Sequence, residues 1–366
     1  MKKLLIVLVA LVASLSLTGC KKAKEYKLGM GVVAATSTSK DQKDATVTIA
    51  QVDATVAAVV LDEEGKIVTC RLDAVQNKIN VTAAGVVTVP TTLKTKMELG
   101  DDYNMAKFGA SMDWNGDKVV KEWYEQAKAF EAHVVGMTAA DVKAMPTKVV
   151  EGAGYVISAD EALLAAGCTI QITDFKAAVA KACEDTQGTT FTTKEEFTLG
   201  VAATSFDDGS YSVKEVTNKD GSKETKGEIL VYSDFAASVV IDGKIAASLN
   251  DAIQPKFAVK PAEEDVTVTG SFSATKRELK EDYNMAKFGA TMDPNGDKVV
   301  KEWYLQSAEF SKFVVGMTGE EVAAMETKAN NIGYQMSTNE TLLAAGCTIQ
   351  ITAIKAVVAK SVANAR

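Results

Sequence analysis

Residues 102–138 read DYNMAKFGASMDWNGDKVVKEWYEQAKAFEAHVVGMT, and residues 282–318 read DYNMAKFGATMDPNGDKVVKEWYLQSAEFSKFVVGMT. The two stretches agree at 28 of 37 positions, so the chain contains an internal duplication. The stretch LLAAGCTIQIT at residues 163–173 recurs unchanged at 342–352, and Leu28-Gly29 recurs as Leu199-Gly200. A period of about 180 residues is far longer than that of a solenoid. The duplication therefore predicts two copies of a whole domain.

The 366 residues also suggest two domains by length. We expect the copies at residues 28–184 and 198–366, joined by a polar linker at 185–197. The second copy contains every element of the first, so residues 198–366 are predicted to fold alone.

Each copy shows strand patterns first and helix patterns later. Residues 45–61 and 66–72 are rich in Val, Ile and Thr, and a turn at 62–65 separates them; the turn shortens to Asp242-Gly243 in the second copy. The apolar residues of 117–134 fall at helical spacing, with Trp123 on the apolar stripe and Tyr124 beside it. This order predicts α+β domains, each an antiparallel sheet followed by packed helices.

Several capping signals bound the expected helices. Thr138-x-x-Asp141 and Ser158-x-x-Glu161, with their second-copy counterparts, are capping boxes. Glycines at 167 and 346 are expected to end one helix of each copy, and Thr173 and Thr352 to open the last one.

The N-terminus carries an export signal. Two lysines precede an apolar run at residues 4–17, which is shorter than the roughly 20 residues of a membrane-spanning helix. The run ends in Leu17-Thr18-Gly19-Cys20, which resembles the lipobox of bacterial lipoproteins. The resemblance implies cleavage before Cys20, lipidation of that cysteine, and anchoring to the outer face of the cell membrane. Residues 20–27 would then form a lipidated basic tether.

Composition excludes several kinds of function. The net charge of −8 and pI near 5.1 argue against nucleic-acid binding. The single histidine, His133, is replaced by Phe313 in the second copy, which excludes a duplicated Ser-His-Asp or Cys-His site. Cys70, Cys168, Cys183 and Cys347 have no metal-site spacing, and we expect buried free thiols rather than a disulfide framework. We therefore predict no catalytic residues and no enzyme activity.

A glycine turn before a helix could present backbone N–H groups to a phosphate. Here the chain resembles the FMN-binding module of bacterial respiratory subunits and flavin-carrying lipoproteins. That module ends in Asp-x-x-Ser-Gly-Ala-Thr and carries FMN on its threonine, and it has a Gly-Lys-Ile element that Gly65-Lys66-Ile67 and Gly243-Lys244-Ile245 match. The resemblance implies FMN as cofactor and a cofactor-binding set made of two triplets, Gly167, Cys168, Thr169 and Gly346, Cys347, Thr348.

This chain departs from the module's motif in both copies. Leu163 and Leu342 stand at its aspartate position, and Ala166 and Ala345 stand at its serine position. An attaching enzyme that reads the acidic residue is not expected to modify these threonines, so any flavin would be held non-covalently.

A second duplicated polar set completes the expected ligand site. It comprises Asp102, Tyr103, Asn104 and Asp282, Tyr283, Asn284, where the module has its central loop, with Lys107 and Lys287 as nearby cations. Recent duplication explains the same retention without a site. Residues 113–117 and 293–297 are similar to half of a calcium loop but lack its glycine and glutamate, so we interpret them as turn and helix cap and expect no metal.

Two functions follow from these patterns. The first is a membrane-anchored extracytoplasmic lipoprotein that binds FMN, or a similar anionic ligand, and transfers electrons. The alternative is a non-catalytic ligand-binding or structural surface lipoprotein whose flavin-binding modules are degenerate.

Overall fold

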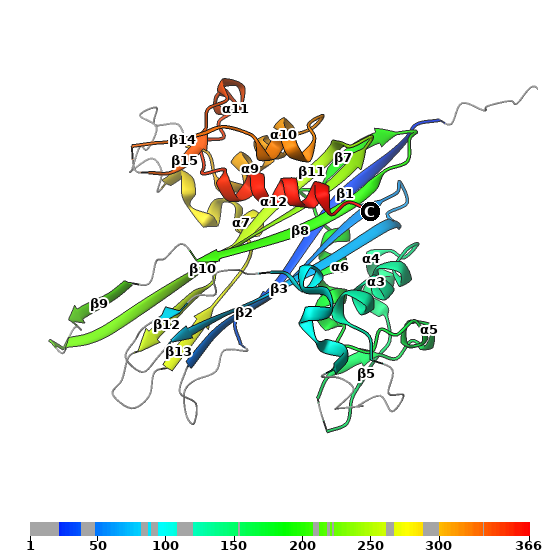
Figure 1. Cartoon of the computed structure of the whole chain (residues 1–366), viewed down its shortest axis with the longest axis horizontal. Helices are drawn as coiled ribbons and strands as arrows, with labels where there is room; N and C mark the ends of the chain where they lie inside the picture. The colour runs from blue at the N-terminus through cyan, green and yellow to red at the C-terminus, as the bar shows by residue number, and fades with distance from the viewer. Residues whose placement is uncertain are drawn as a thin grey trace, which may run out of the picture.

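The computed structural model describes residues 22–37, 48–81, 87–88, 94–107, 120–152, 154–207, 212–217, 220–221, 223–260, 267–287, 300–331 and 333–366. The fold is α+β, with antiparallel sheets and helices (Figure 1). The expected fold class is therefore confirmed. Within the described residues, none of the helices combines the length and apolarity needed to cross a bilayer.

The first sheet has the strand order β4-β3-β2-β1-β7. Its strands are β1 (Lys24–Ala35), β2 (Thr48–Leu61), β3 (Ile67–Val81), β4 (Val87–Thr88) and β7 (Thr189–Thr193). The predicted turn at 62–65 joins β2 to β3, and β3 runs nine residues beyond its expected end. β7 lies within the expected linker at 185–197, and β1 includes part of the expected tether at 20–27. Both stretches are strands because they pair with each other, with Tyr26 opposite Phe191.

The second sheet is built around one long strand, β10 (Lys223–Ile241). β8 (Thr198–Asp207) and β11 (Lys244–Ile253) flank one end of β10, while β9 (Ser212–Thr217) and β12 (Lys256–Lys260) flank the other, followed by β13 (Thr267–Ser271). β11 and β12 occupy the place of the single strand β3. Pro255 stands between them and lacks the N–H that would continue the ladder.

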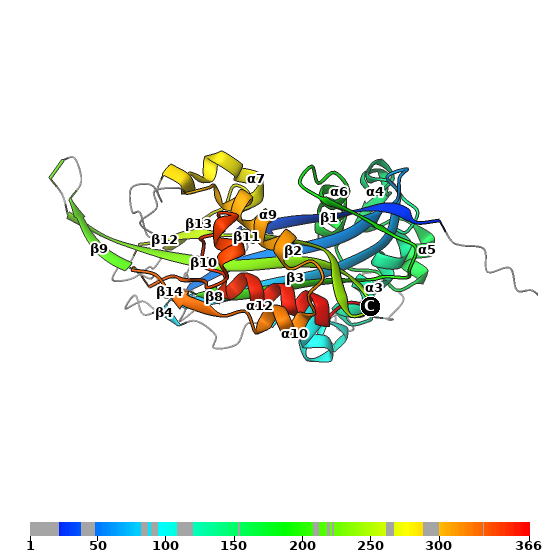
Figure 2. The ribbon, with the colours of Figure 1, turned by 90° about the horizontal axis from the view of Figure 1, so that it is seen from above.

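The two sheets pack face to face, with helices on their outer faces (Figures 1 and 2). One buried core lies between the sheets and combines Leu28 and Val56 of the first half with Leu199 and Phe235 of the second. Two further cores lie between each sheet and its own helices. The predicted domains therefore share a core, and a fragment 198–366 would expose the inner face of its sheet.

The helices follow the same order in both halves. In the first half they are α1 (Lys96–Leu99), η1 (Gly100–Tyr103), α3 (Trp123–His133), α4 (Ala139–Ala144), α5 (Glu161–Ala165) and α6 (Thr173–Cys183). In the second half they are α7 (Lys276–Leu279), η2 (Lys280–Tyr283), α9 (Trp303–Phe313), α10 (Gly319–Ala323), α11 (Glu340–Ala344) and α12 (Thr352–Ala363). A small hairpin precedes α5 and α11, made of β5 (Thr147–Val149) with β6 (Val156–Ser158), or β14 (Thr327–Ala329) with β15 (Gln335–Ser337).

The duplicated Leu-Gly pairs allow the last helix of each half to lie directly on its sheet. A Cβ on Gly29 would lie 2.0 Å from the carbonyl oxygen of Ala182 in α6. One on Gly200 would lie 1.8 Å from that of Ser361 in α12. No residue larger than glycine fits at either position without moving the helix.

Three of the expected helix starts were wrong, one of them at Ser337, because Asn339 is the residue that caps α11. The helix expected from residue 117 begins at Trp123, because Glu122 is its N-cap and exchanges a capping box with Glu125. The helix expected to be capped by Ser158 is capped by Asp160, whose carboxylate accepts from the N–H groups of Ala162 and Leu163. The capping boxes at Thr138 and Thr318 and the helix starts at Thr173 and Thr352 are confirmed.

Candidate functional site

The two Gly-Cys-Thr elements form helix C-caps. Gly167 ends α5 with a φ of +89°, and the N–H groups of Gly167 and Cys168 donate to the carbonyls of Leu164 and Leu163. The second copy repeats this geometry at Gly346. The backbone N–H groups of the glycine and the cysteine are therefore hydrogen-bonded to carbonyls of the preceding helix, and they are not available to bind a phosphate.

The cysteines and threonines of these elements are buried. Cys168 and Cys347 are fully inaccessible, and burial raises the pKa of each thiol to about 12, so neither is a ready nucleophile. Thr169 is 3% exposed, and its N–H and Oγ1 lie 2.8 and 3.4 Å from Oε1 of Gln126. Thr348 makes the same contacts with Gln306, at 2.7 and 3.3 Å.

Gln126 connects three parts of the first half. Its Oε1 also accepts from the N–H of Ile170, and its Nε2 donates to the carbonyl of Lys121 and approaches the sulfur of Met105. One turn earlier, Lys121 Nζ donates to the carbonyl of Ala166, the last residue before Gly167. The side chains of Lys121 and Gln126, at the start of α3, therefore hydrogen-bond to the backbone on both sides of Gly167-Cys168.

The Asp-Tyr-Asn sets end η1 and η2: the aspartate and tyrosine are the last two residues of the 3-10 helix, and the asparagine is its C-cap. Asn104 and Asn284 adopt the left-handed conformation, with φ of 59° and 58°, and each Nδ2 donates to the carbonyl of the preceding aspartate, Asp102 or Asp282. The aspartates are exposed. This geometry explains the retention of asparagine, which tolerates positive φ better than most residues.

Glu122 holds the segment that follows Asn104. Its buried carboxylate accepts from the N–H groups of Met105 and Ala106 at 2.9 and 3.1 Å, and Glu302 repeats both bonds in the second half. The two predicted residue sets are thus both fastened to the start of α3 or α9, one through the glutamate and the other through the glutamine. These hydrogen bonds form a structural clamp that joins the two sets in each half.

A lysine among aromatic rings was missed by the sequence analysis. Lys276 is 9% exposed, and its Nζ lies 5.2, 5.1 and 5.4 Å from the ring centroids of Tyr232, Tyr283 and Trp303. Lys96 lies over Tyr103 and Trp123 in the same way. The lysine fills the space between the rings, so Tyr103 and Tyr283 serve a cation–π contact within the protein. The sequence signal for this contact was that Lys96 and Lys276 stand at equivalent positions of the two copies, shortly before the Asp-Tyr-Asn sets.

A pair of buried aspartates supports the helices that carry these lysines. Asp73 Oδ1 accepts from the N–H groups of Ala74 and Met97, and Asp251 makes the equivalent bonds to Ala252 and Arg277. Burial raises the pKa of Asp73 to about 7 and that of Asp251 to about 6. Asp234, near Lys276, also has its pKa raised by burial to about 6.

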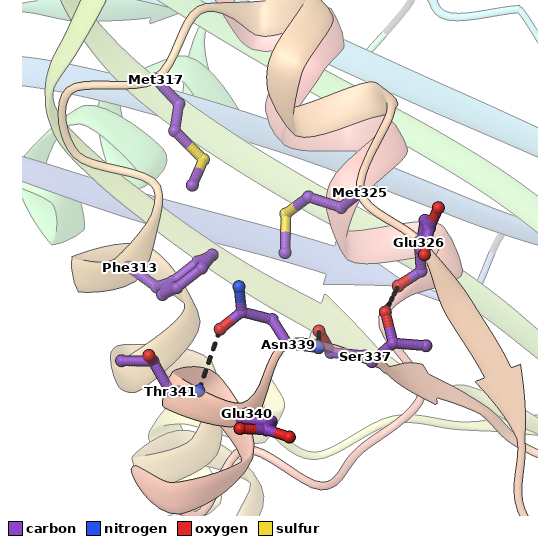
Figure 3. Close-up of a pocket in the computed structure, with 9 residues that line it drawn as sticks. Phe313, Met317, Met325, Glu326, Ser337, Asn339, Glu340 and Thr341 are labelled. Carbon is purple, nitrogen blue, oxygen red and sulfur yellow. Dashed lines mark hydrogen bonds between the residues drawn. The ribbon is translucent and has the colours of Figure 1, made fainter.

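The second half carries a hollow away from both predicted sets. It measures about 530 Å³ and is lined by Phe313, Met317 and Met325 on one side and by the polar stretch 337–341 on the other (Figure 3). The first half has His133 and Asp160 at the positions of Phe313 and Asn339, and these two side chains lie 3.7 Å apart. The volume is within the range of small-ligand sites.

Some predicted features lie outside the described residues. These are Cys20 with its lipobox, and the calcium-like stretches at 113–117 and 293–297. Where the structure does describe the chain, no cluster of three or more His, Cys, Asp or Glu side chains could hold a metal ion. The cysteines at 70, 168, 183 and 347 are free and buried.

The residues as folded do not fit a covalently attached FMN. The hydroxyl that would carry the phosphate is buried in the first half, at Thr169, and contacts a glutamine in both halves. No protein-family model matches this chain, and no curated protein or solved structure is detectably similar to it. The resemblance to the FMN-binding module therefore stays a prediction.

Proposed function

We propose that this chain is a lipid-anchored, extracytoplasmic lipoprotein with a non-catalytic binding or structural role. The observation that carries the proposal is the closure of both Gly-Cys-Thr elements. Thr169 and Thr348 are each hydrogen-bonded to a glutamine of α3 or α9. They stand where the FMN-binding module, which this chain resembles, has its flavin-carrying threonine. A chain that resembles the module but closes this position is expected to act without the flavin.

The hollow beside α10 supports a binding role for the second half. Three apolar side chains face it, and Asn339 carries an amide group at its polar side (Figure 3). Asn339 Oδ1 is used to cap α11, accepting from the N–H groups of Thr341 and Leu342, which leaves its amide nitrogen on the side of the hollow. Such a site suits a small ligand that has both an apolar surface and a hydrogen-bond acceptor.

The anchor is tested by replacing the proposed lipidated cysteine. Cys20→Ala is expected to move the protein from the membrane fraction to the soluble fraction, and to abolish its labelling by radioactive palmitate, because two acyl chains provide stable anchoring. Cys183→Ala, which removes a different cysteine, should leave both properties unchanged. A Cys20→Ala protein that still carries the label, or that stays with the membranes, would contradict the proposed anchor.

A further inference from the structure

The end of α3 carries a buried imidazole nitrogen that makes no hydrogen bond. His133 is the last residue of α3, and its side chain is 17% exposed. Among the residues that the structure describes, its Nε2 has no hydrogen-bond partner, since Oδ2 of Asp160 lies 3.7 Å away, which is too far for a hydrogen bond. A neutral imidazole with its proton on Nδ1 would keep at Nε2 the lone pair that metal ions bind.

The second half shows which side chains surround this position. Phe313 is the equivalent of His133, and it faces the hollow of the second half together with Met317, Met325 and Asn339 (Figure 3). The equivalents of these three residues in the first half are Met137, Met145 and Asp160.

The backbone at these positions is fixed in the same way in both halves. The carbonyl of the first methionine accepts from an N–H of β3 or β11, and that of the second accepts from a lysine of α6 or α12. These bonds run from Ile67 to Met137, Ile245 to Met317, Lys176 to Met145 and Lys355 to Met325. Asp160 and Asn339 likewise each cap the helix that follows them through Oδ1. The side chains that meet at the hollow of the second half are therefore expected to meet in the first half as well.

Two thioethers and one imidazole form a donor set for a soft cation. Soft sulfur ligands select Cu(I), and imidazole also binds copper. Met145 is 5% exposed and Met137 is half-buried, so the protein holds both side chains in place. The carboxylate of Asp160, beside His133, supplies the negative charge that balances the cation. Zn²⁺ prefers thiolate, imidazole and carboxylate ligands, and two thioethers do not suit it.

The differences between the halves fall on the polar members of this set. Both methionines are present in each half, whereas His133 and Asp160 are replaced together by Phe313 and Asn339. The second half therefore lacks both the nitrogen donor and the balancing charge, and it has a hollow in their place. The complete donor set belongs to the first half alone.

We propose that His133, Met137 and Met145 bind a single Cu(I) ion in the first half, with the Asp160 carboxylate as its counter-charge. The ion is bound by coordination alone, and no electron is transferred. The site depends neither on the lipid anchor nor on a ligand in the hollow of the second half.

The test is an anaerobic titration of the mature protein with Cu(I) that is buffered by a chromophoric chelator. We expect His133→Phe and Met145→Leu to bind the ion at least about tenfold more weakly than the parent does. Phenylalanine already stands at the equivalent position of the second half, and leucine is close to methionine in volume, so both variants are expected to fold. Met30→Leu, at a buried methionine of β1 outside the donor set, is the matched control and should bind as the parent does. The cysteines are the same in all four proteins, so any uptake by thiols cancels in the comparison.

The second half supplies a variant that should gain a site. Phe313→His combined with Asn339→Asp gives the second half the donor set of the first, and this protein should take up one further Cu(I) ion. X-ray absorption at the copper edge should show sulfur and nitrogen neighbours in the parent, and loss of the nitrogen in His133→Phe.

Three results would overturn the proposal. The first is a parent that takes up no Cu(I), and the second is a folded His133→Phe or Met145→Leu protein that binds Cu(I) as tightly as the parent. The third is displacement of the bound Cu(I) by an equimolar amount of Zn²⁺, because a site built from thioethers should prefer the softer ion.

Discussion

At Lys280 the backbone has a φ of 48° and a ψ of −118°, a combination that suits glycine and strains other residues. The equivalent residue of the first half is Gly100, with nearly the same angles. The duplication thus offers a comparison within one chain, in which the same turn is built with and without a side chain.

Lys280→Gly is therefore expected to stabilise the protein by about 1 kcal/mol, because relief of strain outweighs the added freedom of the unfolded chain. Gly100→Lys should destabilise it by a similar amount. Urea unfolding of both variants measures the two effects. A loss of stability in Lys280→Gly would show that the lysine side chain contributes more than its backbone costs.

The pKa of Asp73 makes stability depend on pH. Its pKa is about 7 in the folded protein and 3.8 in a free aspartate, because the folded carboxyl is buried. The folded state therefore binds the proton more tightly. This contribution to stability is fully present below about pH 4 and is lost as the pH rises through 7, and it amounts to roughly 4 kcal/mol at most.

Asp73→Asn should remove this dependence, because the amide keeps the acceptor for the N–H groups of Ala74 and Met97 and carries no charge. We expect the variant to be more stable than the parent at pH 8, with a smaller difference at pH 5, as measured by urea midpoints. Asp102→Asn, the same substitution at an exposed position, is the control. An equal effect of Asp73→Asn at both pH values would contradict the assigned role.

Single residues also show which structural features could be predicted from the sequence. The helix stop at Gly167 and the burial of Trp123 were predictable, because glycine and apolar spacing act locally. The partners of the candidate residues were not, since Gln126 meets Thr169 across 43 positions of sequence. The same glutamine is retained in both copies, as Gln126 and Gln306. The sequence alone, however, does not distinguish a buried, hydrogen-bonded glutamine on a helix from an exposed one.

Among the elements, the contact between α12 and β8 sets the position of the last helix. Gly200→Ala places a Cβ 1.8 Å from the Ser361 carbonyl oxygen, and a backbone atom cannot move aside as a side chain can. We expect a loss of about 3 kcal/mol or more, measured by thermal or urea unfolding. Gly319→Ala adds a Cβ no closer than 3.2 Å to its neighbours and is the matched control. A near-neutral Gly200→Ala would mean that α12 does not lie against β8 as described.

Element boundaries were predictable where a local cap determines them and failed where a distant partner does. Thr138 caps α4 from its own side chain, and the sequence indicated it. β7 has no local signature apart from its threonines, and it becomes a strand because β1 provides the adjacent ladder. The stretch therefore read as a linker.

At the scale of the whole molecule, the duplication indicated two units of α+β structure. The packing of one sheet on the other could not be predicted from the sequence. The inner face of each sheet is apolar, as in a separate domain with a covering layer. Only the structure shows that the covering layer of each sheet is the other sheet. Cys168 and Cys347 of the two closed Gly-Cys-Thr elements belong to the outer cores, between each sheet and its own helices, and not to the core between the sheets.

The most direct test of the proposed function is the visible absorption spectrum and intact mass of the mature protein, purified from its native membrane. We predict no flavin band and a mass that exceeds the cleaved polypeptide by its lipid alone, because Thr169 and Thr348 are bonded to Gln126 and Gln306. A flavin band with the added mass of FMN would contradict the closure of these elements. A flavin band without added mass would contradict the non-flavin role and favour electron transfer by a bound cofactor.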